Sequence, residues 1–76
     1  HVEVARILLE HGQDPNSKRK TGHTCLMLAA EQGNYDMVKL LLDNGAFTNS
    51  ITDQYWNATF AAAYGGNLKV LELILN

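Results

Sequence analysis

Apolar side chains recur at helical spacing in five short segments of this chain. The clearest stripe occupies positions i, i+1, i+4 and i+5 of its segment and consists of Met37, Val38, Leu41 and Leu42. This spacing places all four on one face of an α-helix and leaves the polar residues between them on the other face. The pattern predicts helices over five ranges: 2–10, 24–32, 35–44, 57–64 and 68–76.

Residues at the ends of these segments support the predicted boundaries. The side chains of Thr24 and Asn57 can accept hydrogen bonds from the free amides of a first helical turn. Gly33 and Gly45 each follow a predicted helix, where the chain commonly needs a left-handed residue. The stretch 46–56 has no helical period, and we expect it to form an extended, hairpin-like loop.

The sequence repeats with a period of 33 residues. The segment "LAAEQGN" aligns with "AAAYGGN" one period later, and Gly12 and Asn16 align with Gly45 and Asn49. Helices this short are not stable alone, and one pair cannot bury both of its faces. Stacking successive pairs gives a continuous core. The sequence therefore predicts an all-α solenoid of stacked helix–turn–helix units joined by β-hairpin-like loops.

With this period and these residues, the chain resembles the ankyrin-repeat family. The stretch "GHTCLMLAAEQGNYDMVKLLLDNGAFTN" follows the family pattern nearly throughout. The resemblance covers the whole chain and divides it into a partial repeat (1–18), a complete repeat (19–51) and a further partial repeat (52–76). Because the sequence opens without Met and inside a repeat, we expect a fragment of a larger repeat array.

Two departures from the family pattern bear on local structure. The family has Thr-Pro-Leu-His at the start of the first helix, whereas residues 24–27 read "TCLM" and residues 57–60 read "NATF". Tyr55 stands where the family has a glycine, the position that Gly22 occupies one period earlier. Because that glycine typically allows a positive φ, we expect the later hairpin to have an altered turn.

Composition excludes several classes of function. The net charge of −2 argues against general nucleic-acid binding, and no apolar run approaches the length of a membrane span, so no membrane insertion is expected. A single cysteine, Cys25, favours a reducing, intracellular compartment, either cytoplasm or nucleus. The basic run Ser17–Lys20 is expected to be a solvated loop, with an acidic partner, nucleic acid or a nuclear signal as alternatives.

Catalytic and metal-binding motifs are lacking in the sequence, so we expect no enzyme activity, no cofactor and no metal. His23 and Cys25 stand two residues apart, but no third group is evident to orient them as a catalytic pair. We expect Cys25 to replace the family's proline and His23 to lie exposed on the hairpin. The triplet "NAT" at 57–59 matches a glycosylation signal, but we interpret Asn57 as a helix cap.

The resemblance implies a partner-binding surface on the concave side, formed by the hairpin tips and the exposed face of the first helices. In the complete repeat these positions are Lys18, Lys20, Thr21, His23, Glu31 and Gln32. In the next repeat they are Ile51, Asp53, Gln54, Trp56 and Tyr64, with Tyr55 as a further candidate. The alternative for Tyr55 and Trp56 is that they fold onto a neighbouring hairpin. Phe47 and Phe60 are expected to be packing residues.

These expectations lead to a protein-interaction module that binds a partner protein or peptide on its concave hairpin and inner-helix face. The alternative is a regulatory or targeting segment of a larger enzyme, channel or transcription regulator whose chemistry lies outside this chain. An architectural spacer without a ligand is a third possibility. No polar capping repeat is visible at either end, so self-association through the uncapped ends is also expected.

Overall fold

The computed structural model describes residues 2–75 and contains five α-helices in that range. They are α1 (Val2–Glu10), α2 (Cys25–Gln32), α3 (Tyr35–Asp43), α4 (Ala58–Gly65) and α5 (Leu68–Leu75). These bounds differ from the predicted ranges by at most one residue. The predicted last position, Asn76, lies outside the described residues. Within residues 2–75 the only β-type pairing is an isolated antiparallel bridge between Lys18 and Thr24.

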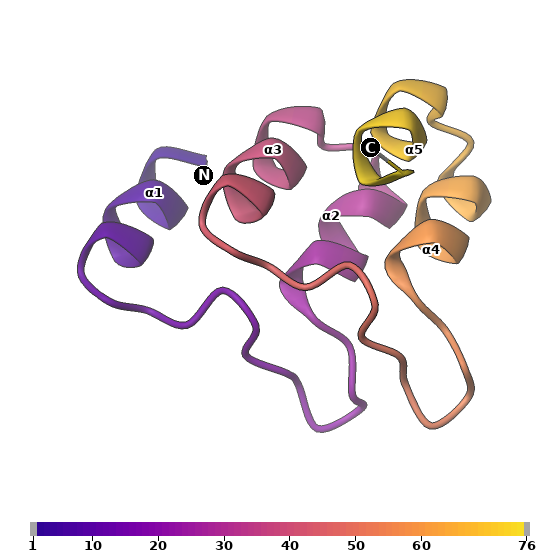
Figure 1. Ribbon diagram of the computed structural model, residues 1–76, viewed down its shortest axis with the longest axis horizontal. Helices are drawn as coiled ribbons and strands as arrows, with labels where there is room; N and C mark the ends of the chain where they lie inside the picture. The colour runs from indigo at the N-terminus through magenta and orange to yellow at the C-terminus, as the bar shows by residue number, and fades with distance from the viewer. Residues whose placement is uncertain (1, 76) are drawn as a thin grey trace.

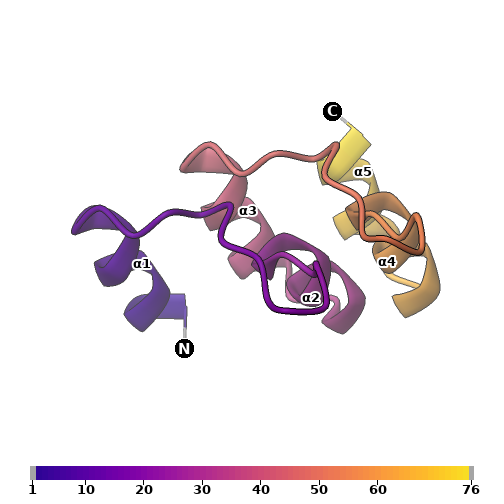
Figure 2. The same ribbon diagram turned by 90° about the horizontal axis from the view of Figure 1, so that it is seen from below.

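The helices form two layers (Figure 1). The outer layer contains α1, α3 and α5, and the inner layer contains α2 and α4. Two long loops project from one end of the inner layer, and the view from below shows each loop close to the inner helix that follows it (Figure 2). We call residues 17–24 the first hairpin and residues 50–57 the second hairpin. The all-α repeat solenoid predicted from the sequence is confirmed.

Side-chain caps begin both inner helices as predicted. Thr24 Oγ1 accepts a hydrogen bond from the Met27 amide at 3.3 Å, and Asn57 Oδ1 accepts one from the Phe60 amide at 2.8 Å. Both inner helices end at a left-handed glycine, Gly33 with φ 70° and Gly66 with φ 71°. The capping residues therefore fix the length of the inner helices, because each satisfies backbone groups that a helix end leaves unpaired.

The core lies mainly between α2 and α4, which pack along a face of small residues. Ala58, Ala61 and Ala62 are almost completely buried, and with Gly65 they occupy positions i, i+3, i+4 and i+7 of one helix face. A Cβ added to Gly65 would lie 2.3 Å from the Glu31 carbonyl oxygen of α2. This face of α4 is therefore in close backbone contact with α2.

Asparagine side chains join each loop to the neighbouring repeat. The Nδ2 of Asn67 donates to the Gly33 carbonyl at 3.4 Å, while its Oδ1 accepts from the Val70 amide at 2.9 Å. Asn16 makes a similar pair of hydrogen bonds, from its Nδ2 to the Gly45 carbonyl and from the Phe47 amide to its Oδ1. The bonds to the Gly33 and Gly45 carbonyls and from the Phe47 amide satisfy loop backbone groups across the repeats, while the bond from the Val70 amide caps α5.

The substitution Gly65→Ala should destabilise the protein by about 1–3 kcal/mol, since the added methyl group overpacks the contact with α2. In an unhindered helix the same change would normally stabilise by up to about 1 kcal/mol. The matched control Ala63→Gly, at an exposed position of the same helix, should cost about 1 kcal/mol. Urea denaturation followed by circular dichroism measures both. A Gly65→Ala variant more stable than the wild type would contradict the close contact.

Candidate functional site

Three aromatic side chains gather at the end of the second hairpin and along α4. We call Trp56, Phe60 and Tyr64 the aromatic row. The ring of Trp56 lies 6.3 Å from that of Phe60 and 5.9 Å from that of Tyr64, centroid to centroid, and the second pair is edge-to-face. Trp56 is half-buried against the core, whereas Phe60 is 52% exposed and Tyr64 75% exposed. The aromatic row is therefore attached to the core through Trp56, while the rings of Phe60 and Tyr64 are largely accessible to a partner.

The exposure of Phe60 corrects a prediction from the sequence. Phe60 stands one period after Met27, which is 1% exposed because α4 covers it. Within residues 2–75 no helix pair covers α4 in the same way, so Phe60 remains open and contacts the Trp56 ring instead. Phe47 was also expected to pack, and it too is exposed. The expectation of packing is therefore met for Phe60 only on its Trp56 side, and it is wrong for Phe47.

The second hairpin keeps the turn of the first one, contrary to the prediction of an altered turn. Tyr55 has φ 64° and Gly22, one period earlier, has φ 89°. The hydrogen bonds match as well: the amides of Tyr55 and Gly22 each donate to the carbonyl three residues before, at 2.9 Å. Tyr55 is the single non-glycine residue with positive φ in the described part of the chain. The glycine was thus replaced without a change of turn, and Tyr55 carries the strain.

Thr52 holds this strained turn in place, and the sequence analysis missed it. Its hydroxyl is buried and accepts hydrogen bonds from the Gln54 amide at 3.2 Å and the Trp56 amide at 3.1 Å. The corresponding residue of the first hairpin is Arg19, which has no such hydroxyl. A threonine two residues before the turn centre is a known turn signal that could have pointed to this role. Through its bond to Trp56, Thr52 also positions the base of the aromatic row.

The structure brings some of the predicted site residues together. Trp56 and Tyr64 are in direct contact, and Tyr55 extends from the adjoining turn, 75% exposed. The two hairpins are neighbours, since a Cβ on Gly22 would lie 3.6 Å from Thr52. The remaining predicted residues lie on the two hairpins or at the end of α2. His23 is half-buried, and the exposed ones are Lys18, Lys20, Thr21, Glu31, Gln32, Ile51, Asp53 and Gln54.

Charge is unevenly distributed over the molecule. The ion pairs of residues 2–75 lie on outer helices and join Arg6 to Glu3 and Glu10, and Lys39 to Asp43. Hydrogen bonding to the Arg6 guanidinium lowers the pKa of the Glu3 carboxyl.

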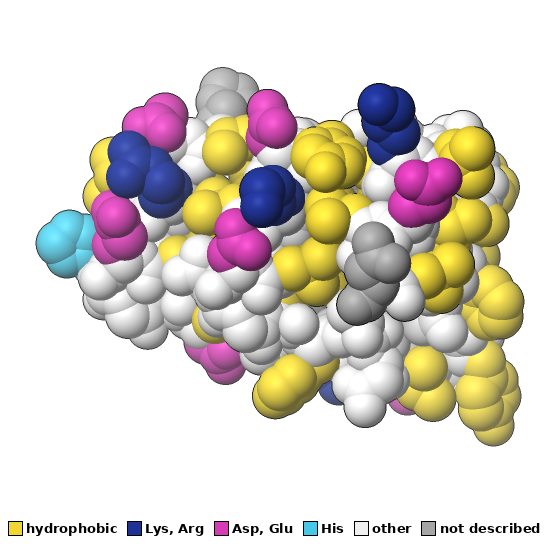
Figure 3. All heavy atoms as spheres, turned by 45° about the horizontal axis from the view of Figure 1, so that its top comes forward, with side chains coloured by type: hydrophobic (Ala, Val, Ile, Leu, Met, Phe, Trp, Pro, Cys, Tyr) yellow, Lys and Arg dark blue, Asp and Glu magenta, His cyan; other side chains and the backbone are white. Residues whose placement is uncertain are grey.

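Seen from above, hydrophobic side chains follow the edge formed by α4 and α5 (Figure 3). The basic residues of the first hairpin make no ion pair within the described part of the chain.

The geometry offers little for catalysis. Nδ1 of His23 lies 2.8 Å from Oγ1 of Thr21, and no hydrogen bond joins His23 to Cys25, which is exposed. Between residues 2 and 75, no three His, Cys, Asp or Glu side chains cluster closely enough to hold a metal ion. In the same range, none of the helices has the length and apolar character needed to cross a bilayer.

A family model described as "Ankyrin repeats (3 copies)" matches residues 1–76. The chain belongs to the ankyrin-repeat family. Repeats of this family are in general non-catalytic modules for protein interaction, and an open aromatic row beside two hairpins is consistent with that role.

Relatives of known name support the assignment. An ankyrin repeat and KH domain-containing protein of Caenorhabditis briggsae is 32% identical over 77 residues, which cover 99% of this chain and 3% of the relative. A mouse protein fem-1 homolog A-like is 34% identical over 67 residues, covering 88% of this chain and 10% of the relative. The NF-kappa-B inhibitor cactus of Drosophila melanogaster is 38% identical over 60 residues, covering 78% and 12%. The chain thus spans a small part of these relatives.

The substitution Tyr55→Gly should stabilise this ankyrin array by about 0.5–1 kcal/mol. Relief of the left-handed strain gains about 1–2 kcal/mol, and the extra freedom of glycine in the unfolded chain offsets about half of it. Thermal unfolding measures the change. The control Tyr55→Ala removes the ring but keeps the strain, so it should leave stability nearly unchanged. Equal stabilisation by both variants would show that the ring, and not the backbone, is responsible.

Proposed function

We propose that this ankyrin array binds a partner protein or peptide through its hairpin tips and inner-helix face, with the aromatic row as the anchor. The observation that carries the proposal is the geometry of that row. Trp56 is fixed against the core and supports two largely exposed rings. Large aromatic side chains supply much of the binding energy at protein interfaces, especially when they are held rigidly.

The charges of the two hairpins suggest the chemistry of the partner. Lys18, Arg19 and Lys20 form a basic tip on the first hairpin, while the second hairpin presents Asp53 beside the aromatic residues. A partner segment with acidic residues next to an apolar anchor would complement both tips at once. The proposed contact residues are the twelve predicted positions together with Phe60, which the structure adds to the row.

Further parts of the proposal concern catalysis, cofactors, other binding partners and location. We propose that these 76 residues perform no catalysis, need no cofactor, neither insert into a membrane nor bind nucleic acid, and work inside the cell. The repeat boundaries 1–18, 19–51 and 52–76 stay a prediction. Self-association remains a secondary proposal, supported by the exposed apolar side chains of Phe60 and Leu75 at the α4–α5 end.

An alternative function is a regulatory or targeting segment of a larger enzyme, channel or transcription regulator. The short coverage of the longer relatives favours it, because chemistry can then lie in the remainder of the protein. Two relatives bear names of this kind, the NF-kappa-B inhibitor cactus and an Arabidopsis thaliana E3 ubiquitin-protein ligase, XBAT33, which is 33% identical over 79 residues. Under this alternative, the same surface would still make the contact.

Affinity capture with variant baits tests the proposal. Trp56→Ala should reduce recovery of a specific partner at least about tenfold, since it removes the base of the aromatic row at a hot-spot position. The double variant Lys18→Ala/Lys20→Ala should weaken capture less and mainly at low salt, because exposed charges act over a screened distance.

The matched control is Lys69→Ala, an exposed position on the outer helix α5. It should leave capture unchanged. Circular dichroism verifies that each bait is folded. If Trp56→Ala and the lysine double variant both retain every partner that the wild type captures, the concave surface is not the binding site.

A further inference from the structure

The two hairpins share one backbone arrangement. Their turns match, and the hydrogen bonds that close the two hairpins match as well. The Arg19 amide donates to the His23 carbonyl at 2.9 Å. One period later, the Thr52 amide donates to the Trp56 carbonyl over the same distance. Equivalent amides of the two hairpins therefore point in equivalent directions.

Two amides of the second hairpin converge on one oxygen atom. Thr52 Oγ1 accepts a hydrogen bond from the Gln54 amide at 3.2 Å and another from the Trp56 amide at 3.1 Å. This oxygen belongs to the same hairpin as the two amides, although the first hairpin packs beside Thr52. The acceptor is therefore supplied by the residue at this position and not by the neighbouring hairpin of the stack.

The corresponding amides of the first hairpin are those of Thr21 and His23. Neither donates a hydrogen bond to an acceptor among residues 2–75. A contact of 2.8 Å between Thr21 Oγ1 and His23 Nδ1 fixes the two residues relative to one another. Because the backbones match, both amides point toward the place that the threonine oxygen occupies in the second hairpin. Convergent backbone amides in a turn form a concave site for an anion.

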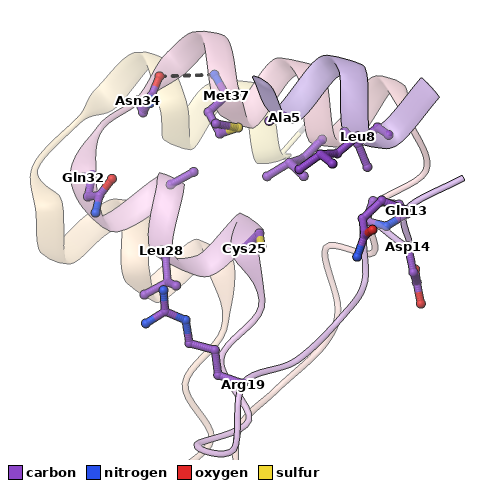
Figure 4. Close-up of a pocket in the computed structure, with 14 residues that line it drawn as sticks. Ala5, Leu8, Gln13, Asp14, Arg19, Cys25, Leu28, Gln32, Asn34 and Met37 are labelled. Carbon is purple, nitrogen blue, oxygen red and sulfur yellow. Dashed lines mark hydrogen bonds between the residues drawn. The ribbon is translucent and has the colours of Figure 1, made fainter. Parts of the chain in front are cut away.

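Arg19 stands at the position of Thr52 and cannot supply this oxygen, because a guanidinium group has N–H donors and no acceptor. Its side chain lines a pocket of about 310 Å³ between α1, α2 and α3, where it lies beside Leu28 (Figure 4). The side chain of Arg19 thus extends toward α2 and away from its own turn. The unpaired amides result from this residue, which belongs to the first hairpin itself.

The side chains next to these amides are basic. Lys18 and Lys20 flank Arg19, and the three together make up half of the Lys and Arg residues of the chain. All three are exposed, and none forms an ion pair with another residue that the structure describes. In the second hairpin, Asp53 stands at the position of Lys20. Of the two hairpins, the first alone combines free convergent amides with positive charge.

We propose that the turn of the first hairpin binds an anionic group of the partner protein, either a carboxylate or a phosphorylated side chain. One oxygen of this group accepts hydrogen bonds from the amides of Thr21 and His23, as Thr52 Oγ1 does in the second hairpin. The basic side chains nearby balance its charge. The inference assigns a site to the anionic part of the partner, and in this respect it rests on the proposed function.

Titration of the isotope-labelled protein with inorganic phosphate, at constant pH and ionic strength, tests the site by amide NMR. The Thr21 and His23 amide protons should shift downfield together. Half-saturation is expected at roughly 1–10 mM, because the hydrogen bonds act without the other contacts of a partner. The Gln54 and Trp56 amides already donate to Thr52 and should not shift. Acetate is titrated in the same way, and the tighter probe identifies the class of anionic side chain.

A pair of variants with the same shape separates hydrogen bonding from charge. Arg19→Thr supplies the hydroxyl that the second hairpin has at this position, so it should abolish the phosphate-induced shifts of both amides. Arg19→Val loses the same charge but adds no hydroxyl. It should keep the shifts and bind phosphate about threefold more weakly at low salt. Arg19 is exposed, so both variants should fold, which circular dichroism verifies.

Ordinary hydration of the hairpin tip would give a different result. The proposal is overturned if neither anion, up to about 50 mM, shifts the Thr21 and His23 amides. It is equally overturned if Arg19→Thr binds phosphate as well as Arg19→Val does, or if the Gln54 and Trp56 amides shift to the same extent. The titration needs no partner, whereas affinity capture with Trp56→Ala does, so either proposal can fail without the other.

Discussion

The close packing of α4 on α2 is the contact on which the rest of this ankyrin array depends. Alanine and glycine on the facing side of α4 let the two backbones approach until no Cβ fits at Gly65. This contact aligns the two inner helices and brings the two hairpins beside one another. It also decides which face of each inner helix is buried and which is open. Short helices that are unstable alone thereby become one cooperative unit.

The candidate binding surface follows from that alignment and from one strained turn. Tyr55 adopts the left-handed conformation of the glycine it replaces, and the buried hydroxyl of Thr52 holds the turn around it. The turn delivers Trp56 to the start of α4, where its ring contacts Phe60 and Tyr64. Strain of this kind tends to persist where the surroundings over-determine the conformation, often at functional sites.

Most of the fold could be predicted from the sequence because it depends on local signals. The apolar spacing of α3, the caps Thr24 and Asn57, and the left-handed Gly33 all act within one turn of a helix. The family resemblance added the stacking order. The predicted alteration of the second hairpin failed for a physical reason. A glycine indicates that a turn position can adopt a positive φ at little cost. A tyrosine at that position does not exclude a positive φ, because surrounding residues can compensate for the strain.

By itself, the sequence determined the helices, their ends, the period and hence the solenoid, since each is encoded in residues close together in the chain. Only the tertiary structure decided the burial of individual side chains. Met27 and Phe60 stand at equivalent positions, yet one is covered by the next inner helix and the other is open. Leu8 and Leu41 are also one period apart, yet Leu8 is 49% exposed and Leu41 only 4% exposed. Burial depends on which neighbour is present, and a local pattern does not contain that information.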